Sequence, residues 1–198
     1  MDFVVGLPRT MGKYDSIWVI VDRLTKSTHF IPVKVTYNAE KLAKIYISEI
    51  VQLHVVPLSI ILDRGTQFTS KFWRTLPAEL GTRLDLSTAF HPQTDGQSER
   101  TIQVLEDMLR AYVIEFGGHW DNFLPLAEFS YNNSYHSSID MAPFEALYGR
   151  RCMSPIGWFD AFKVRPWGTD LLRESLEKVK FIQKKLLAAQ SRLKEYAD

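Results

Sequence analysis

The sequence predicts an α/β domain with a mixed sheet, and two observations carry this prediction. Runs rich in β-branched and aromatic residues, which are typical of strands, occupy residues 2–7, 16–22, 29–35, 58–62 and 83–87. Between and after these runs, apolar residues recur with the 3.6-residue period of amphipathic helices. Short connections join the first runs, whereas helical segments separate the later ones. This order describes an antiparallel meander followed by alternating helices and strands.

The first half of the chain supports this arrangement element by element. Asn38 is placed to cap a helix whose apolar positions are Leu42, Ile45, Tyr46, Ile50 and Leu53. Pro57 then introduces the all-apolar run 58–62, which is typical of a strand covered on both faces. A helix over 70–80 and the alternating run 83–87 follow.

A polar stretch separates the last predicted strand from a long helix. Residues 91–98 are rich in turn-forming and small polar side chains, so we predict a mobile loop with Gly96 as its flexible point. Glu99 then opens a helix, which Gly117 and Gly118 end.

The remaining sequence is predicted to be helical. Helices are expected around 120–131 and 142–148, with the aromatic side chains of Trp120, Phe123 and Phe129 in the core. From Thr169 an amphipathic helix of almost thirty residues begins. Glutamines interrupt its heptad seam, so packing on a neighbouring element is favoured over a self-associating coiled coil. We expect a core domain over 1–160 and a linker with a C-terminal amphipathic helix over 161–198.

Composition limits the classes of protein to consider. The 12 Phe, 8 Tyr and 5 Trp supply enough large side chains for a sizeable core. No run approaches the roughly 18 apolar residues of a membrane span, and residues 1–10 lack the features of a signal peptide. The single cysteine, Cys152, excludes a disulfide framework and a cysteine-rich zinc module within this chain. The histidines have no zinc-ligand spacing.

Charge is divided unevenly along the chain. The net charge is only +1, a small value for a nucleic-acid-binding protein. Residues 163–198 carry nine Lys/Arg against five Asp/Glu, whereas residues 1–162 carry 15 against 18. An acidic core with a basic tail is compatible with a metal-using domain whose DNA contacts lie partly elsewhere.

Three acidic residues stand where predicted strands end or helices begin. Asp2 lies on the first strand, Asp63 ends the buried fourth strand, and Glu99 opens the helix after the polar loop. Ligands of α/β sheets bind outside strand ends, and carboxylate oxygens are the ligands that Mg²⁺ prefers. Two such ions about 4 Å apart can stabilise both the attacking and the leaving oxygen of a phosphodiester displacement.

Each acid also has an explanation without chemistry. Asp2 can be solvated beside the terminus, Asp63 stands in a good turn sequence, and an acid in the first turn of a helix is favoured by the helix dipole. The residues alone therefore lead to an α/β domain with a candidate acidic metal site.

Longer stretches carry a family resemblance. The segments "MDFVVGLPRT", "SIWVIVDRLTKSTHF", "LDRGTQFTSKFW", "LSTAFHPQTDGQSERTIQVLEDMLR" and "YNNSYHSSIDMAPFEALYGRRC" resemble the integrase catalytic core of gypsy-class LTR retrotransposons of the plant type. The likeness covers residues 1 to about 160. It implies a ribonuclease H-like fold, with a mixed five-stranded sheet flanked by helices.

The resemblance also implies an active site. The family uses an Asp, Asp, Glu triad with 35 residues between the last two, which is the separation of Asp63 and Glu99 here. The triad therefore falls on Asp2, Asp63 and Glu99, as catalytic residues and as ligands of Mg²⁺ or Mn²⁺, with two ions expected. The implied reaction is 3′-end processing followed by DNA strand transfer.

Other polar residues are candidates for DNA contact. Gln97, Ser98 and Arg100 flank the glutamate, and Arg150 and Arg151 form the longest basic run before the tail. Arg100, Arg150 and Arg151 have an equal or better explanation as solvated surface charges. Asn132, Asn133, His136 and Ser137 can bond phosphate, but turn and capping roles are favoured for them.

The implied partners are element and target DNA, with a homo-oligomer as the active form, no membrane, and action in the nucleus. Three other functions remain open. The first is an inactive nucleic-acid-binding remnant, because the chain begins one residue before Asp2 and Pro77 falls within a predicted helix. The others are an interaction module built on the last helix and a ribonuclease H nuclease.

Overall fold

The computed structural model describes residues 1–62, 81–86, 92–152, 177 and 181. The chain divides into two compact units, one formed by residues 1–20 and 31–100 and the other by residues 21–30 and 101–198. The predicted helix over 70–80, with Pro77, lies outside the described residues. Of the predicted C-terminal helix only Glu177 and Phe181 are described, and both are helical.

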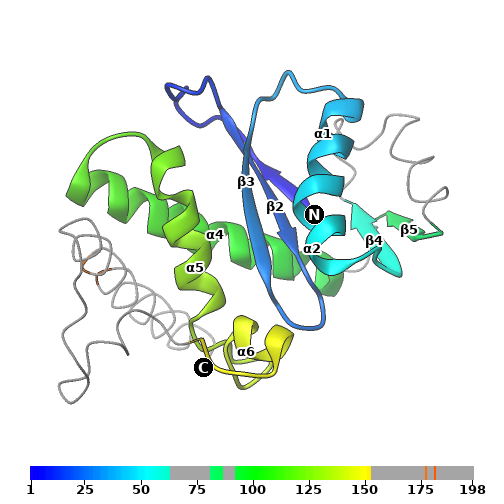
Figure 1. Cartoon of the computed structure of the whole chain (residues 1–198). Helices are drawn as coiled ribbons and strands as arrows, with labels where there is room; N and C mark the ends of the chain where they lie inside the picture. Colours follow the sequence, from blue (N-terminus) through cyan, green and yellow to red (C-terminus); the bar gives the residue numbers. More distant parts are fainter. Residues whose placement is uncertain (63–80, 87–91, 153–176, 178–180, 182–198) are drawn as a thin grey trace, which may run out of the picture. The chain divides into compact units, whose positions relative to one another are not determined.

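The first strands form an antiparallel sheet in the order β1-β2-β3 (Figure 1). Their bounds are Asp2–Val4 for β1, Ser16–Val21 for β2 and Thr28–Val33 for β3. β1 pairs with β2 so that Asp2 faces Val19 and Val4 faces Ile17. The hydroxyl of Ser16, which is completely buried, donates to the carbonyl oxygen of Val4 at 2.8 Å and fixes this register.

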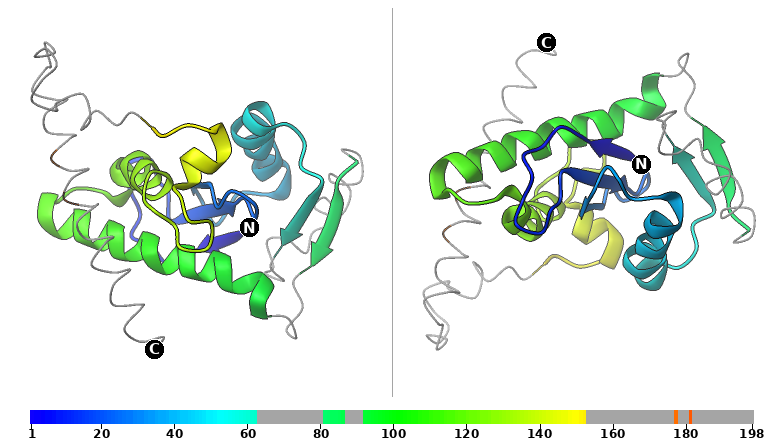
Figure 2. Two further views of the ribbon diagram at one scale, coloured as in Figure 1. Left: turned by 90° about the horizontal axis from the view of Figure 1, so that it is seen from below. Right: turned by 90° about the horizontal axis from the view of Figure 1, so that it is seen from above.

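Two further strands pair in parallel, as Figure 2 shows from both sides. They are β4, Ser59–Leu62, and β5, Arg83–Leu86, with Ile61 opposite Asp85. All five predicted strands are therefore present, within three residues of the predicted ends. In the part of the chain that is described they form a three-stranded and a two-stranded sheet, so one continuous five-stranded sheet is not confirmed.

The helix predicted after Asn38 is present in three consecutive parts. These are α1, Ala39–Tyr46, then a π-helical turn, η1, Ile47–Val51, and α2, Gln52–His54. The side chain of Asn38 accepts a hydrogen bond from the backbone N–H of Lys41 at 2.9 Å, as expected for an N-cap. The helix ends at Val55, whose φ of 65° and ψ of 179° lie in a region that is normally open only to glycine.

The core of the first unit is formed by side chains of β2, β3 and β4 and of the helical segment that begins with α1. It contains the buried side chains of Trp18, Ile20, Val33, Leu42, Tyr46, Ile50 and Ile60. Phe3 stacks on Trp18 with ring centroids 5.6 Å apart, and Tyr46 lies 6.0 Å from the same ring. Four of the five apolar helix positions that the sequence predicted, Leu42, Ile45, Tyr46 and Ile50, belong to this cluster or pack against it.

One prediction in this part of the chain is wrong. The long helix α4 spans Pro92–Phe116, so residues 92–98 are helical and Gly96 lies within the helix instead of in a loop. Proline is well suited to the first helical position, because its φ is already helical and that position needs no N–H donor. Glu99 is consequently the eighth residue of α4 and not its first. The predicted end is confirmed, since Gly117 and Gly118 both have positive φ.

The second unit has its own aromatic core. It includes η2, Trp120–Phe123, α5, Leu124–Asn132, and α6, Pro143–Tyr148, which agree with the predicted helices. The rings of Tyr112 and Phe123 stack with centroids 5.0 Å apart, and Trp120 is buried as predicted. Within the described parts of the chain, no helix is both long and apolar enough to cross a lipid bilayer.

Candidate functional site

Asp2 occupies a half-buried position on β1. The neighbouring side chains of Met1 and Phe3 pack against the core of the first unit. Because side chains alternate along a strand, the carboxylate of Asp2 points to the opposite face of β1. One of its oxygens, Oδ1, accepts a hydrogen bond from the backbone N–H of Phe3 at 2.7 Å.

The start of β1 lies beside the end of β4. The amino group of Met1 donates a hydrogen bond to the carbonyl oxygen of Ile61 at 3.0 Å. Asp2 directly follows that amino group, and Asp63 follows Ile61 by two residues. Met1 and Ile61, which are 60 positions apart in the sequence, are thus brought together within the first unit.

Glu99 lies on the exposed surface of α4, in the same unit as Asp2. Its neighbour Arg100 is exposed and Ser98 is half-buried. Gln97 is on the same helix, but its side chain lies outside the described residues. The carboxylate of Glu99 is therefore accessible to a ligand.

Asp63 itself lies outside the described residues, one position after the end of β4. Among the residues that are described, no group of three or more His, Cys, Asp or Glu side chains forms a metal site. Asp63 is not among them, so the triad of Asp2, Asp63 and Glu99 stays a prediction.

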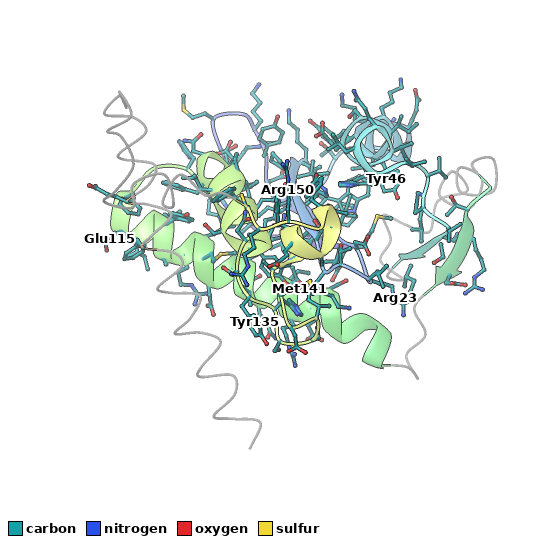
Figure 3. All side chains as sticks on the ribbon, turned by 60° about the horizontal axis from the view of Figure 1, so that its bottom comes forward. Arg23, Tyr46, Glu115, Tyr135, Met141 and Arg150 are labelled. Carbon is teal, nitrogen blue, oxygen red and sulfur yellow. The ribbon has the colours of Figure 1, made fainter. Side chains whose placement is uncertain are left out.

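The basic pair predicted for DNA contact follows α6. Arg150 is exposed, and the side chain of Arg151 makes an ion pair with Glu145 of α6, with 3.5 Å between Nε and Oε1. Figure 3 shows Arg150 after α6, and Tyr135 and Met141 on the loop that precedes this helix. Both arginines are therefore accessible, although the charge of Arg151 is partly balanced.

Both asparagines at the end of α5 make structural hydrogen bonds, and that of Asn133 is the capping role that the sequence favoured. Asn132 accepts a hydrogen bond from the N–H of Thr28 at 2.9 Å and donates one to its carbonyl oxygen at 2.9 Å. Asn133 donates to the carbonyl oxygen of Phe129 at 2.8 Å and closes the end of the helix. The ring of His136 bonds the hydroxyl of Ser138 at 2.9 Å within the following turn.

Sequence reasoning missed a neighbouring contact of the same helix. Glu128 accepts a hydrogen bond from the N–H of Phe30 at 2.8 Å and lies 3.3 Å from Nδ1 of His29. Glu128 and Asn132, one helical turn apart, therefore bond every second residue on the outer side of β3. The partners are about one hundred residues apart, so only the fold identifies them.

Known proteins with similar sequences are retrotransposon polyproteins. The Tf2-3 and Tf2-4 polyproteins of Schizosaccharomyces pombe are 34% identical to the chain over 148 residues, which is 75% of its length. The chain spans 11% of the length of these relatives. No family model matches the sequence.

Solved structures with a similar fold are retroviral integrases. The simian T-cell lymphotropic virus intasome in complex with PP2A regulatory subunit B56 gamma has a TM-score of 0.63 at 20% identity, over 76% of this chain and 53% of that one. The BIV integrase catalytic core has 0.57 at 23%, over 73% and 89%. The trimeric form of the HTLV-2 integrase catalytic core in complex with magnesium has 0.55 at 17%, over 72% and 99%. The chain is therefore a homologue of a segment of the Tf2 retrotransposon polyproteins and has the ribonuclease H-like α/β fold of retroviral integrase catalytic cores.

Proposed function

We propose that the chain is the catalytic core of a retrotransposon integrase, which cleaves and joins DNA by divalent-metal-dependent phosphodiester chemistry. The observation that carries the proposal is the hydrogen bond from Met1 to Ile61, which joins the residue before Asp2 to the strand that precedes Asp63. The sequence similarity to retrotransposon polyproteins and the fold of retroviral integrases support it.

The proposed metal ligands are Asp2, Asp63 and Glu99. Their chemistry fits Mg²⁺ or Mn²⁺, because carboxylate oxygens are hard ligands. Asp2 is half-buried and Glu99 is exposed, so an ion can reach both side chains. Two such ions would supply charge stabilisation for the attacking and leaving oxygens of the DNA. The side chains themselves position the reacting groups, and no covalent bond between DNA and protein is needed.

The proposed partner is DNA, both the ends of the element and a target. An intasome and a trimeric catalytic core among the similar structures support an oligomer as the active form. Integration into chromosomal DNA would place the protein in the nucleus.

A metal-dependent assay on branched integration intermediates tests this function. We expect the 198-residue chain to resolve the branched DNA with Mn²⁺ or Mg²⁺ and not with a chelator. Asp63→Asn and Glu99→Gln should lower the rate by about 100-fold or more, because each removes one charged ligand. Glu106→Gln is the matched control, since Glu106 is an exposed acid two turns further along α4.

Three results would contradict the proposal. Equal rates for wild type and both active-site variants would show that the activity comes from a contaminant. A comparable loss in Glu106→Gln would show that the assay responds to the charge of α4 and not to a site. DNA binding without metal-dependent turnover would favour the inactive remnant.

A further inference from the structure

The connection between β1 and β2 ends in a tight, well-bonded turn. The N–H of Lys13 donates to the carbonyl oxygen of Thr10 at 2.9 Å, and the N–H of Thr10 donates to the carbonyl oxygen of Tyr14, also at 2.9 Å. The N–H of Tyr14 in addition bonds the hydroxyl of Thr10 at 3.3 Å, and Thr10 is buried. The tip of this turn is therefore held in a defined position.

Two residues at the tip have backbone conformations or contacts that few side chains would tolerate. Lys13 has a φ of 63°, a left-handed conformation in which glycine or asparagine is normally found. A Cβ atom added to Gly12 would lie 2.6 Å from the ring of Tyr14, so this ring sits directly on the backbone of Gly12. A cationic side chain occupies the position where glycine would be least strained, which indicates a use for its charge.

A second cation is held beside the turn. The ammonium of Lys34 lies 5.9 Å from the ring centroid of Tyr14 and 5.9 Å from that of Tyr37. The two segments are joined by Asp15, whose carboxylate accepts a hydrogen bond from the N–H of Val35 at 2.8 Å. The aromatic faces attract the ammonium and keep it in one place at the surface.

Further cations lie close to these two tyrosines in the sequence. We define the basic turn surface as Lys34 with the rings of Tyr14 and Tyr37 that it contacts, together with the cations within five sequence positions of these tyrosines, Arg9, Lys13 and Lys41. The described acids close to it in the sequence are Asp15 and Glu40, and the charge of Glu40 is balanced by Lys44 at 2.8 Å. A local balance of four cations against Asp15 contrasts with a net charge of −3 for residues 1–162.

We propose that the basic turn surface binds the phosphate backbone of double-stranded DNA. Lysine and arginine side chains neutralise phosphates, and this contact does not depend on base sequence. The rings of Tyr14 and Tyr37 orient Lys34 for such a contact and leave its N–H donors available. The inference rests on the proposed function, because it assigns the partner to a second surface of the same catalytic unit.

The distance from the proposed active site suits this role. Figure 1 shows that the connection after β1 and the connection between β3 and α1 leave the three-stranded sheet at the same end. Arg9 is seven residues from Asp2, so the two positions are separated by at most about 25 Å. One turn of a DNA duplex is about 34 Å long, so a duplex held at Asp2 can extend to the basic turn surface.

An alternative is that these cations only keep the surface soluble. A solvated lysine does not require a left-handed backbone, and it does not require two aromatic rings around its ammonium. Each feature restricts the conformational freedom of a lysine, which is unfavourable, and both are explained if the charges must be presented in a fixed arrangement.

Salt-dependent binding of a labelled duplex of arbitrary sequence tests the inference. Binding is measured with the full chain in a chelator, so that no turnover occurs. We expect Lys13→Gly and Lys34→Gln each to weaken binding and to lower the slope of log K against log salt by about 1. Lys13→Gly should leave the melting temperature unchanged or raise it, because it relieves the left-handed strain. A lower affinity at equal or higher stability would separate binding from folding.

Two further variants sharpen the comparison. Gly12→Ala forces the ring of Tyr14 to move without changing any charge, so it should weaken binding while the salt slope changes little. Arg83→Gln is the matched control, because Arg83 is an exposed cation of the same unit whose charge is already paired with Asp85 at 2.8 Å. Its affinity and slope should equal those of the wild type.

The inference is overturned if Lys13→Gly and Lys34→Gln bind the duplex as Arg83→Gln does. It is also overturned if the two lysine variants lose affinity only for vesicles of anionic lipid, which would assign the surface to a membrane. The outcome is independent of catalysis: an inert wild type with weakened lysine variants contradicts only the proposed function. Active wild type with unaffected lysine variants contradicts only the basic turn surface.

Discussion

At the scale of single residues, the backbone of β3 depends on two side chains of α5. Asn132 bonds both the N–H and the carbonyl oxygen of Thr28, and Glu128 bonds the N–H of Phe30. Thr28 is fully buried, so these backbone groups have no access to water as a substitute partner. The polar side chains of α5 are consequently part of the folding energetics of the second unit.

We expect Asn132→Ala to destabilise the protein by about 2–3 kcal/mol, because it leaves a buried donor and a buried acceptor of Thr28 without partners. Asn133→Ala is the control, since it removes a hydrogen bond to the carbonyl oxygen of Phe129 at the helix end and should cost about 1 kcal/mol or less. Urea unfolding followed by circular dichroism measures both. Equal losses for the two variants would contradict the special role of Asn132.

A buried tyrosine predicts a loss of stability at alkaline pH. Burial raises the pKa of Tyr46 from 10.0 to about 12. Below pH 10 the phenol is neutral in both states, and between pH 10 and 12 the unfolded chain loses its proton first. The free energy of unfolding should therefore fall over this window, by about 2–3 kcal/mol from this group.

Tyr46→Phe should remove that part of the alkaline loss, and Tyr148→Phe, at an exposed position, should retain it. Burial also raises the pKa of Tyr112, so the stability of Tyr46→Phe should still depend on pH in this range, and its profile is compared with that of the wild type. Identical pH profiles for Tyr46→Phe and the wild type would show that Tyr46 ionises normally in the folded protein.

At the scale of elements, the sequence predicted the described strands and helices well and one boundary badly. Strand positions follow from local composition, and the helix after Asn38 follows from its cap and its apolar period. The segment 92–98 was assigned to a loop because its residues favour turns, yet it is helical from Pro92 onward. Local preference is weak in such a segment, and its continuity with a long helix decides the outcome.

The π-helical turn η1 and the strained residue after α2 were also not foreseeable. No local sequence signal marks either of them, although Tyr46 and Ile50 beside them were expected in the core and lie there. The candidate site divides in the same way. The family resemblance predicts three acids by residue, and this stays a prediction, whereas the bond between Met1 and Ile61 is seen only in the fold.

Val55 offers a test at this scale. Its φ of 65° and ψ of 179° are unfavourable for a β-branched residue, and its side chain is 74% exposed, so replacement loses little packing. Val55→Gly should stabilise the protein by about 1–2 kcal/mol. Val55→Ala keeps a Cβ atom and should gain less. A destabilised glycine variant, measured by thermal unfolding, would show that Val55 makes contacts that outweigh its strain.

At the scale of the whole molecule, the proposed metal site links ligand binding to stability. An ion that binds only the folded chain raises its stability, by about 2.7 kcal/mol at a concentration of 100 times Kd. We expect Mn²⁺ to raise the melting temperature of the wild type and of Glu106→Gln. Asp63→Asn and Glu99→Gln should lose this increase. An increase that survives in both active-site variants would place the ion elsewhere.

The outer side of β3 has a consequence for solubility. Among the described strands β3 lies at the edge of its sheet, and the α5 side chains occupy its outward N–H groups at Thr28 and Phe30. An uncovered strand edge is a template on which a second chain can add, and natural proteins protect such edges. Replacing Glu128 and Asn132 together would free this template, so the first sign of damage would be concentration-dependent aggregation, visible as light scattering below the melting temperature.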